Sequence, residues 1–189
     1  MALQQQNFDP IVSAKSQLAN KNSGWSQKAR ESALDRLSKI GLPNPRDEYW
    51  KYTNPTELIS EKPNISPIDD LEDANVFSEL DMQKIVFRNG IFSPELSDDF
   101  SSANMSISKL SEAGDLHWAQ NYYGTLESQG QTPVERPLAT LNTAIASDGV
   151  LIHVKGKIDK PVLILGVHNT PSEAMLHHVI KVDRDCSLT

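Results

Sequence analysis

The pattern of apolar residues near the start of the chain predicts two helices. Asp9 followed by Pro10 is a typical helix start, because the aspartate caps free amides and a proline at the first helical position loses no hydrogen bond, so a helix is expected over 9–20. A second is expected over 26–40, where the apolar residues recur at helical spacing and form one stripe. Gly41 then ends this helix.

The strongest local signal in the sequence is a β-hairpin. Residues 84–93, KIVFRNGIFS, contain two β-rich runs joined by Asn89 and Gly90. This dipeptide favours a type I′ turn, in which both central residues need a positive φ. Alternating residues over 105–110 predict a further strand.

The second half of the chain changes from a helical to a β-rich pattern of residues. A helix is expected from Ser111, as its N-cap, to Gly124, followed by a polar linker over 125–137 and a short helix over 137–147. Three apolar β-runs follow, namely VLIHV at 150–154, VLILGV at 162–167 and HHVIKV at 177–182. Because no helical pattern separates these runs, a meander or a stacked β-solenoid fits better than βαβ units.

The last residues carry no polar cap after the final β-run. Residues 185–189, DCSLT, follow that run directly, whereas solenoids need polar caps on their open ends. The pattern therefore favours an N-terminal piece of a longer β-rich protein. The alternative is a small antiparallel sheet that ends naturally at residue 189.

Charge and composition exclude several classes of protein. The 18 basic and 25 acidic residues give a net charge of −7, which argues against nucleic acid or an anionic membrane as a partner. Residues 69–115 include eleven acidic and three basic residues. This segment forms either a solvated face or a surface for a basic partner. No signal peptide and no apolar stretch long enough to span a membrane is present. Together with the single cysteine, Cys186, this predicts a cytoplasmic protein.

The sequence offers no recognisable active site. Motifs of serine hydrolases, P-loop NTPases, zinc proteases and dinucleotide-binding domains are missing. His177 and His178 are adjacent in a β-run, so their side chains should point to opposite faces. Two interpretations stay open: a metal site built from residues of stacked strands, or histidines that are solvated or lie at the edge of the core. Asp183 and Asp185 are more typical of a solvated turn than of a catalytic carboxylate pair. We therefore expect no catalytic residue, no metal site and no cofactor.

Three segments together resemble the SufB/SufD family of iron–sulfur cluster assembly proteins, and the SufD branch most closely. The sequence GLPNPRDEYWKYT at 41–53 is similar to a family signature. Residues 86–97 are similar to the family's strand, Asn-Gly turn and strand, and residues 141–150 to the segment that leads into its β-helix. Structural or interaction candidates in these segments are Arg46, Asp47, Trp50, Tyr52, Asn89 and Gly90.

The resemblance implies a fold and a role. The fold would be α+β to mainly β, with an α-rich N-terminal domain and hairpin over 1–136 and the start of a right-handed parallel β-helix over 137–189. The role would be that of a non-catalytic scaffold whose partners in the full-length protein are SufB-like and SufC-like subunits. The cysteine and histidine residues that the family uses in cluster formation belong to later parts of its pattern, so Cys186 is interpreted as an ordinary thiol in a β-core or turn.

Two interpretations stay open for individual features. Trp50, flanked by Tyr49 and Tyr52, is either an anchor that holds the connector in place or a stacking platform for bases or sugars. For the whole chain, the alternative to a scaffold is a truncated β-helix polysaccharide lyase or esterase. Self-association is also expected, because an open last strand leaves unpaired backbone groups.

Overall fold

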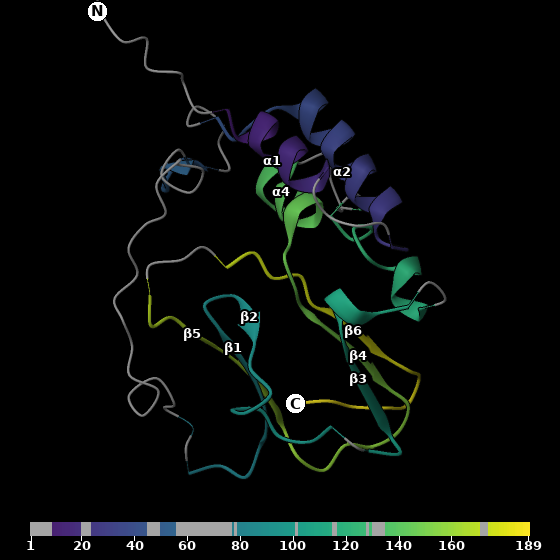
Figure 1. Ribbon diagram of the computed structural model, residues 1–189. Coiled ribbons are helices and arrows are strands. Elements are labelled where there is room, and N and C mark those ends of the chain that lie inside the picture. Colours follow the sequence, from purple (N-terminus) through teal and green to yellow (C-terminus); the bar gives the residue numbers. More distant parts are fainter. Residues whose placement is uncertain are drawn as a thin grey trace, which may run out of the picture. The chain divides into compact units, whose positions relative to one another are not determined.

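The computed structural model describes residues 9–19, 24–44, 50–55, 77, 79–100, 102–114, 117–127, 129, 135–170 and 174–189 (Figure 1). It is a mixed α/β structure with few helices and small sheets. Packing divides the chain into two compact units, one formed by 1–63 with 120–145 and the other by 64–119 with 146–189. The sequence-based domain boundary between residues 136 and 137 stays a prediction.

The first unit begins with the predicted helix α1, Pro10–Ala19. The Asp9 side chain caps it, because its Oδ1 accepts hydrogen bonds from the amides of Ile11 at 2.8 Å and Val12 at 3.3 Å. The capped amides would otherwise lack partners, since the first turn of a helix has no preceding carbonyls to bond. The prediction of a helix that starts after Asp9 is confirmed.

Helix α2, Gln27–Ile40, is also confirmed. Its buried residues, Arg30, Ala33, Leu34 and Leu37, recur at the spacing that places them on one face. At the end of the helix Gly41 has a φ of 78°, and its amide donates to the Leu37 carbonyl at 2.8 Å. This left-handed conformation favours glycine, which explains why the helix stops there.

Helix α4, Pro137–Ile145, packs against both α1 and α2 in the first unit. Tyr123 is fully buried in this unit, and its hydroxyl donates to the Thr143 carbonyl at 2.7 Å. Burial of the phenol disfavours its charged form and raises the pKa of Tyr123 to about 12. The tyrosine thereby holds the preceding segment onto α4 with a satisfied polar group.

The second unit contains two sheets of three strands each. In the first sheet, β1 (Gln83–Arg88) lies between β2 (Ile91–Phe92) and β5 (Val162–Val167). The pair β1–β2 is antiparallel and is the predicted hairpin, whereas β1 and β5 run parallel with Gln83 opposite Val162. Hairpin strands meet through a local turn, but the parallel partner comes from a segment far along the chain.

In the second sheet, β4 (Val150–Val154) lies between β3 (Met105–Lys109) and β6 (Val179–Val182). β3 is antiparallel to β4, and β6 is parallel to it. All three predicted β-runs of the second half are thus strands. The meander is wrong, because β5 lies in the other sheet and β6 pairs in parallel with β4.

The core of this unit joins inward-facing side chains from both sheets. Its fully buried members are Ile85, Phe87, Met105, Val150, Ile152 and Val154. Those on β1 and β4 alternate along their strands and therefore share one face. Val86 and Leu151 on the opposite face are also buried, so these two strands are covered on both faces. The described residues form these two small sheets and no completed solenoid.

The predicted helix from Ser111 to Gly124 is wrong. Instead, two short 3₁₀-helices form, η3 (Leu110–Glu112) and η4 (Trp118–Asn121). The Leu110 amide donates to the Gly149 carbonyl at 2.9 Å and the Ser111 amide to Asp148 Oδ1 at 3.3 Å. These bonds fix the turn to the start of β4, and Ala113 after it is extended, with φ −67° and ψ 123°, so the turn does not continue as an α-helix.

Across the described ranges, no helix is long and apolar enough to cross a membrane.

Candidate functional site

The two hairpin candidates, Asn89 and Gly90, occupy the two-residue turn between β1 and β2. Their φ values are 52° and 77°, so both adopt the left-handed conformation that a type I′ turn requires. Asn89 also reaches across to the end of β5, where its Oδ1 accepts the amides of Asn169 at 3.0 Å and Thr170 at 3.3 Å. The asparagine therefore shapes the turn and also holds the loop that follows β5.

The four candidates in the connector are only partly within the described residues. Arg46 and Asp47 lie outside them. Trp50 is half-buried in a short 3₁₀ turn, whereas the side chain of Tyr52 is 90% exposed. The Lys51 ammonium lies 5.4 Å from the Tyr52 ring centroid. The role of Trp50 as an anchor stays a prediction.

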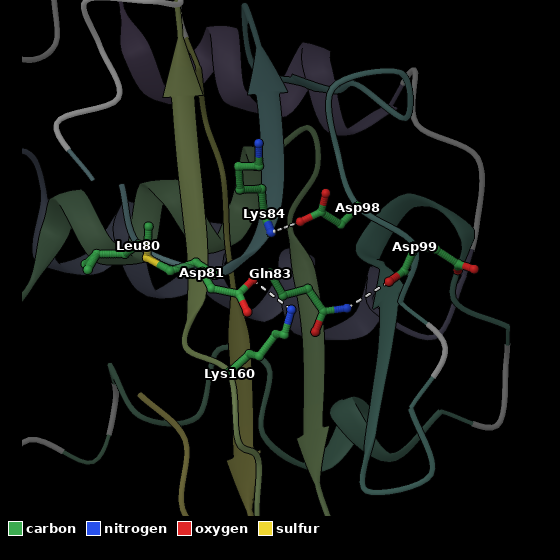
Figure 2. A pocket seen from close by; sticks show the side chains of 8 residues that line it. Leu80, Asp81, Gln83, Lys84, Asp98, Asp99 and Lys160 are labelled. Carbon is green, nitrogen blue, oxygen red and sulfur yellow. Dashed lines mark hydrogen bonds and ion pairs between the residues drawn. The ribbon is translucent and has the colours of Figure 1, made fainter. Parts of the chain in front are cut away.

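An open polar hollow of about 500 Å³ lies beside the start of β1 (Figure 2). Asp81 and Lys160 pair across it, with 2.7 Å between the carboxylate and the ammonium. Asp98 exchanges two hydrogen bonds with Lys84: the Lys84 amide donates to Asp98 Oδ2 at 2.7 Å, and the Asp98 amide donates to the Lys84 carbonyl at 2.9 Å. The acidic side chains of Asp81 and Asp98 are thus both bonded within the lining of the hollow.

The segment that carries Asp98 also covers the exposed edge of β1. Because β2 has only two residues, the rest of that edge needs other partners. The Ser93 amide donates to the Val86 carbonyl at 2.9 Å, and the Ser97 hydroxyl accepts the Val86 amide at 2.9 Å. Unpaired strand edges promote unwanted pairing, so this loop protects the sheet on that side.

A second polar cluster lies on the outer face of the sheet that β3, β4 and β6 form. His153 on β4 contacts Asp183 just after β6, with 3.0 Å between Nε2 and Oδ1. The hydrogen bond from His153 is the main cause that lowers the pKa of Asp183. The ring of Trp118 lies 5.2 Å from that of His153 and 5.3 Å from that of His117.

His117 completes this cluster at its other end. Its Nδ1 accepts the amide of Ala119 at 3.3 Å, and its Nε2 lies 3.0 Å from the Ser108 hydroxyl. Burial lowers the pKa of His117. A ring nitrogen that accepts an amide hydrogen bond cannot carry a proton itself, so this histidine is neutral and positions the chain between β3 and η4.

Sequence reasoning missed this cluster because its members are distant along the chain. The parallel register pairs His153 with Lys181, which places residue 183 one step beyond the end of the pairing. The pattern that could have indicated this contact is the similar spacing of apolar residues in VLIHV and VIKV, if the two runs are taken as neighbouring parallel strands. Asp183 is thus a partner of His153, and Asp185, with a φ of 60°, lies in the turn that follows β6.

The other candidates from the last β-run take different positions. The amide of His177 donates to the Asp148 carbonyl at 3.0 Å, whereas Nδ1 of His178 accepts the amide of Val150 at 3.1 Å. Cys186 is half-buried beside the core. Among the described residues, no group of three or more histidine, cysteine or acidic side chains is placed to hold a metal ion.

The inner face of β6 is apolar, and the residues that the structure describes cover it only in part. Ile180 and Val182 pair with Ile152 and Val154, which are fully buried. Their own side chains are 50% and 44% exposed. In the part of the chain that the structure describes, β6 pairs with β4 on one side and with no strand on the other. This strand therefore presents an apolar surface together with an open edge, the combination found where further β-structure or another protein packs.

Comparison with known proteins identifies the family. The family model of the SufBD protein N-terminal region matches residues 1–164. The chain belongs to this family. The match includes all three segments on which the resemblance rests, and β6 lies beyond it. Assignment to the SufD branch stays a prediction.

One curated member of the SufBD family is similar over most of this chain. It is an iron–sulfur cluster assembly SufBD family protein of Synechocystis sp. (strain ATCC 27184 / PCC 6803 / Kazusa), 27% identical over 176 residues. The alignment covers 85% of this chain and 37% of the cyanobacterial protein. The chain thus spans little more than a third of the relative that it matches.

Proposed function

We propose that this chain is the N-terminal region of a SufD-like scaffold subunit that takes part in iron–sulfur cluster assembly through protein contacts and catalyses no reaction itself. The family match and the name of the Synechocystis relative support a role in cluster assembly. The partly exposed apolar face of β6 supports a role that depends on contact. We propose a cytoplasmic location for the whole protein.

The parallel pairings favour the beginning of a right-handed parallel β-helix. Leu151 on β4 pairs with Val179 on β6, 28 residues later, while β5 between them lies in the other sheet. A second parallel contact of similar span joins Lys157 to Ser187. Parallel returns at a regular interval are typical of stacked coils, in which each coil covers the exposed end of the one before.

The observation that carries the proposal is the position of Ile180 and Val182. Both pair in register with two fully buried residues, yet about half of each side chain is exposed. Burying apolar surface is worth about 25 cal/mol per Å². A further coil or a second scaffold subunit stacked on β6 would therefore gain stability here.

Copurification of the whole protein that carries this chain tests the scaffold role. We expect it to form a complex with a SufB-like scaffold and a SufC-like ATPase, and ATP hydrolysis to require the ATPase subunit. The proposed partners come from the family resemblance. ATP turnover by the purified protein alone, or failure to join either subunit under conditions where those two bind each other, would contradict the proposal.

Self-association through β6 is a separate expectation for the 1–189 chain. Sedimentation velocity over a range of concentrations should show dimers or larger species. The double variant Ile180→Lys and Val182→Lys should shift the protein to monomer, because two charges cannot be buried against a second copy without a large cost. Ile91→Lys is the matched control, since Ile91 is 69% exposed on β2. A monomer at all concentrations would count against this expectation.

A further inference from the structure

The His178 side chain, just before β6, accepts a hydrogen bond from the backbone of β4. Its Nδ1 accepts the backbone amide of Val150, the first residue of β4, at 3.1 Å. An amide N–H can only donate, so Nδ1 must present its lone pair. The imidazole is therefore neutral and carries its proton on Nε2.

This bond lies at the point where two distant segments of the chain come together. Before it, the Ser147 amide donates to the Met175 carbonyl at 2.8 Å, and the His177 amide donates to the Asp148 carbonyl at 3.0 Å. After it, the β4–β6 pairing begins with Leu151 opposite Val179. The His178 side chain thus lies between these two backbone hydrogen bonds and the first residue pair of β4 and β6.

We propose that His178 is an acid-sensitive latch that holds β6 to β4. Protonation of Nδ1 converts the acceptor into a donor that faces another donor, so the bond to Val150 is lost. The start of β6 then separates more easily from β4. No other group in the pairing needs to change its protonation state for this step.

The surroundings of His178 set the pH range of the latch. Its ring lies 5.5 Å from that of Phe87 on β1, and Phe87 and Val150 are uncharged. Asp148, which precedes β4, is the charged group that acts on it and favours protonation. Burial acts in the opposite direction and is the larger effect, so the pKa of His178 lies below its ordinary value of 6.5.

The direction of the pH effect follows from this shift. The unfolded chain binds a proton at residue 178 more readily than the folded chain does, so stability falls as protons are added. The contribution of the latch is complete above the ordinary histidine pKa of about 6.5 and is lost as the pH falls below it. The proposal concerns the pairing of β4 with β6 and does not depend on the proposed scaffold role.

Amide hydrogen exchange and histidine titration by NMR test the latch in the 1–189 chain. We expect the protection factor of the Val150 amide to fall about five- to tenfold on acidification, the size expected for one backbone hydrogen bond, with the midpoint at which His178 titrates. The measurement uses the unmodified protein, so it needs no variant that folds. Unchanged protection of Val150 while His178 titrates, or titration of His178 at or above 6.5, would overturn the proposal.

Two variants separate the latch from other histidines. In His178→Asn the amide Oδ1 takes the place of Nδ1 and can still accept from Val150 but cannot titrate, so we expect the protection of Val150 to become independent of pH in this range. His153→Gln is the matched control, because His153 lies on the outer face of β4 and bonds Asp183 instead. In this control variant the protection of the Val150 amide should still depend on pH. A pH response that persists in His178→Asn would refute the latch.

Discussion

Ile152 and Ile180 are neighbours on parallel strands, yet the first is fully buried and the second is 50% exposed. They share the inner face of the sheet, so their different environments arise from what packs on each strand. β4 is covered by strands on both sides, whereas β6 has one described neighbour. The same residue type in the same register therefore gives a direct comparison of buried and open positions.

We predict that Ile152→Ala destabilises the chain by about 2–5 kcal/mol, because it removes buried methyl groups and leaves a cavity. Ile180→Ala should cost less than about 1.5 kcal/mol, since half of this side chain already contacts water. Urea denaturation of both variants under the same conditions measures the difference. Equal losses would mean that β6 is covered in solution.

The turn at Asn89 gives a second prediction. Asn89→Ala should destabilise the chain by about 1–2 kcal/mol, because alanine resists a positive φ and cannot accept the amides of Asn169 and Thr170. Asn89→Asp keeps an acceptor oxygen and tolerates this conformation, but it loses the bond that Asn89 Nδ2 donates to Asn169 Oδ1, so it should recover only part of the stability. Denaturation curves for the pair provide the measurement, and an aspartate variant as unstable as the alanine variant would argue against this role.

Local signals account for what the sequence predicted correctly. Asp9 and Pro10 indicate where α1 begins, and Asn89 with Gly90 indicates a turn, because each effect depends on neighbours within a few residues. The SufBD family was recognisable for a similar reason, since its signature at 41–53 is contiguous.

Long-range pairing explains what the sequence could not predict. The helix expected after Ser111 is replaced by a 3₁₀ turn that bonds Asp148 and Gly149, more than 35 residues away, and the local pattern does not indicate this contact. The contact of His153 with Asp183 depends on the parallel register of β4 and β6, which alternation alone does not specify.

Asp183 gives a prediction for acid conditions. Because the hydrogen bond from His153 lowers its pKa, ionised Asp183 stabilises the fold above the ordinary value of 3.8, and this contribution is lost as the pH falls through the lowered pKa. Asp183→Asn should therefore lower Tm at about pH 6, and the difference from the unmodified chain should vanish near about pH 2. Thermal unfolding followed by circular dichroism across this range measures it. A difference in Tm independent of pH would show that the charge of Asp183 is not responsible.

Gly149 gives a steric prediction, because the backbone of His177 passes very close to its Cα. A Cβ at this position would lie 2.0 Å from the His177 carbonyl oxygen and 2.6 Å from its carbon, and both are backbone atoms. Gly149→Ala should therefore push residues 148–150 away from 176–178 and destabilise the chain by at least about 2 kcal/mol. Gly166→Ala on β5 is the matched control, since a Cβ there meets no atom within 4 Å. Denaturant unfolding should show a near-neutral effect at Gly166. If Gly149→Ala is tolerated, residues 148–150 and 176–178 lie farther apart in solution than they do in the structure.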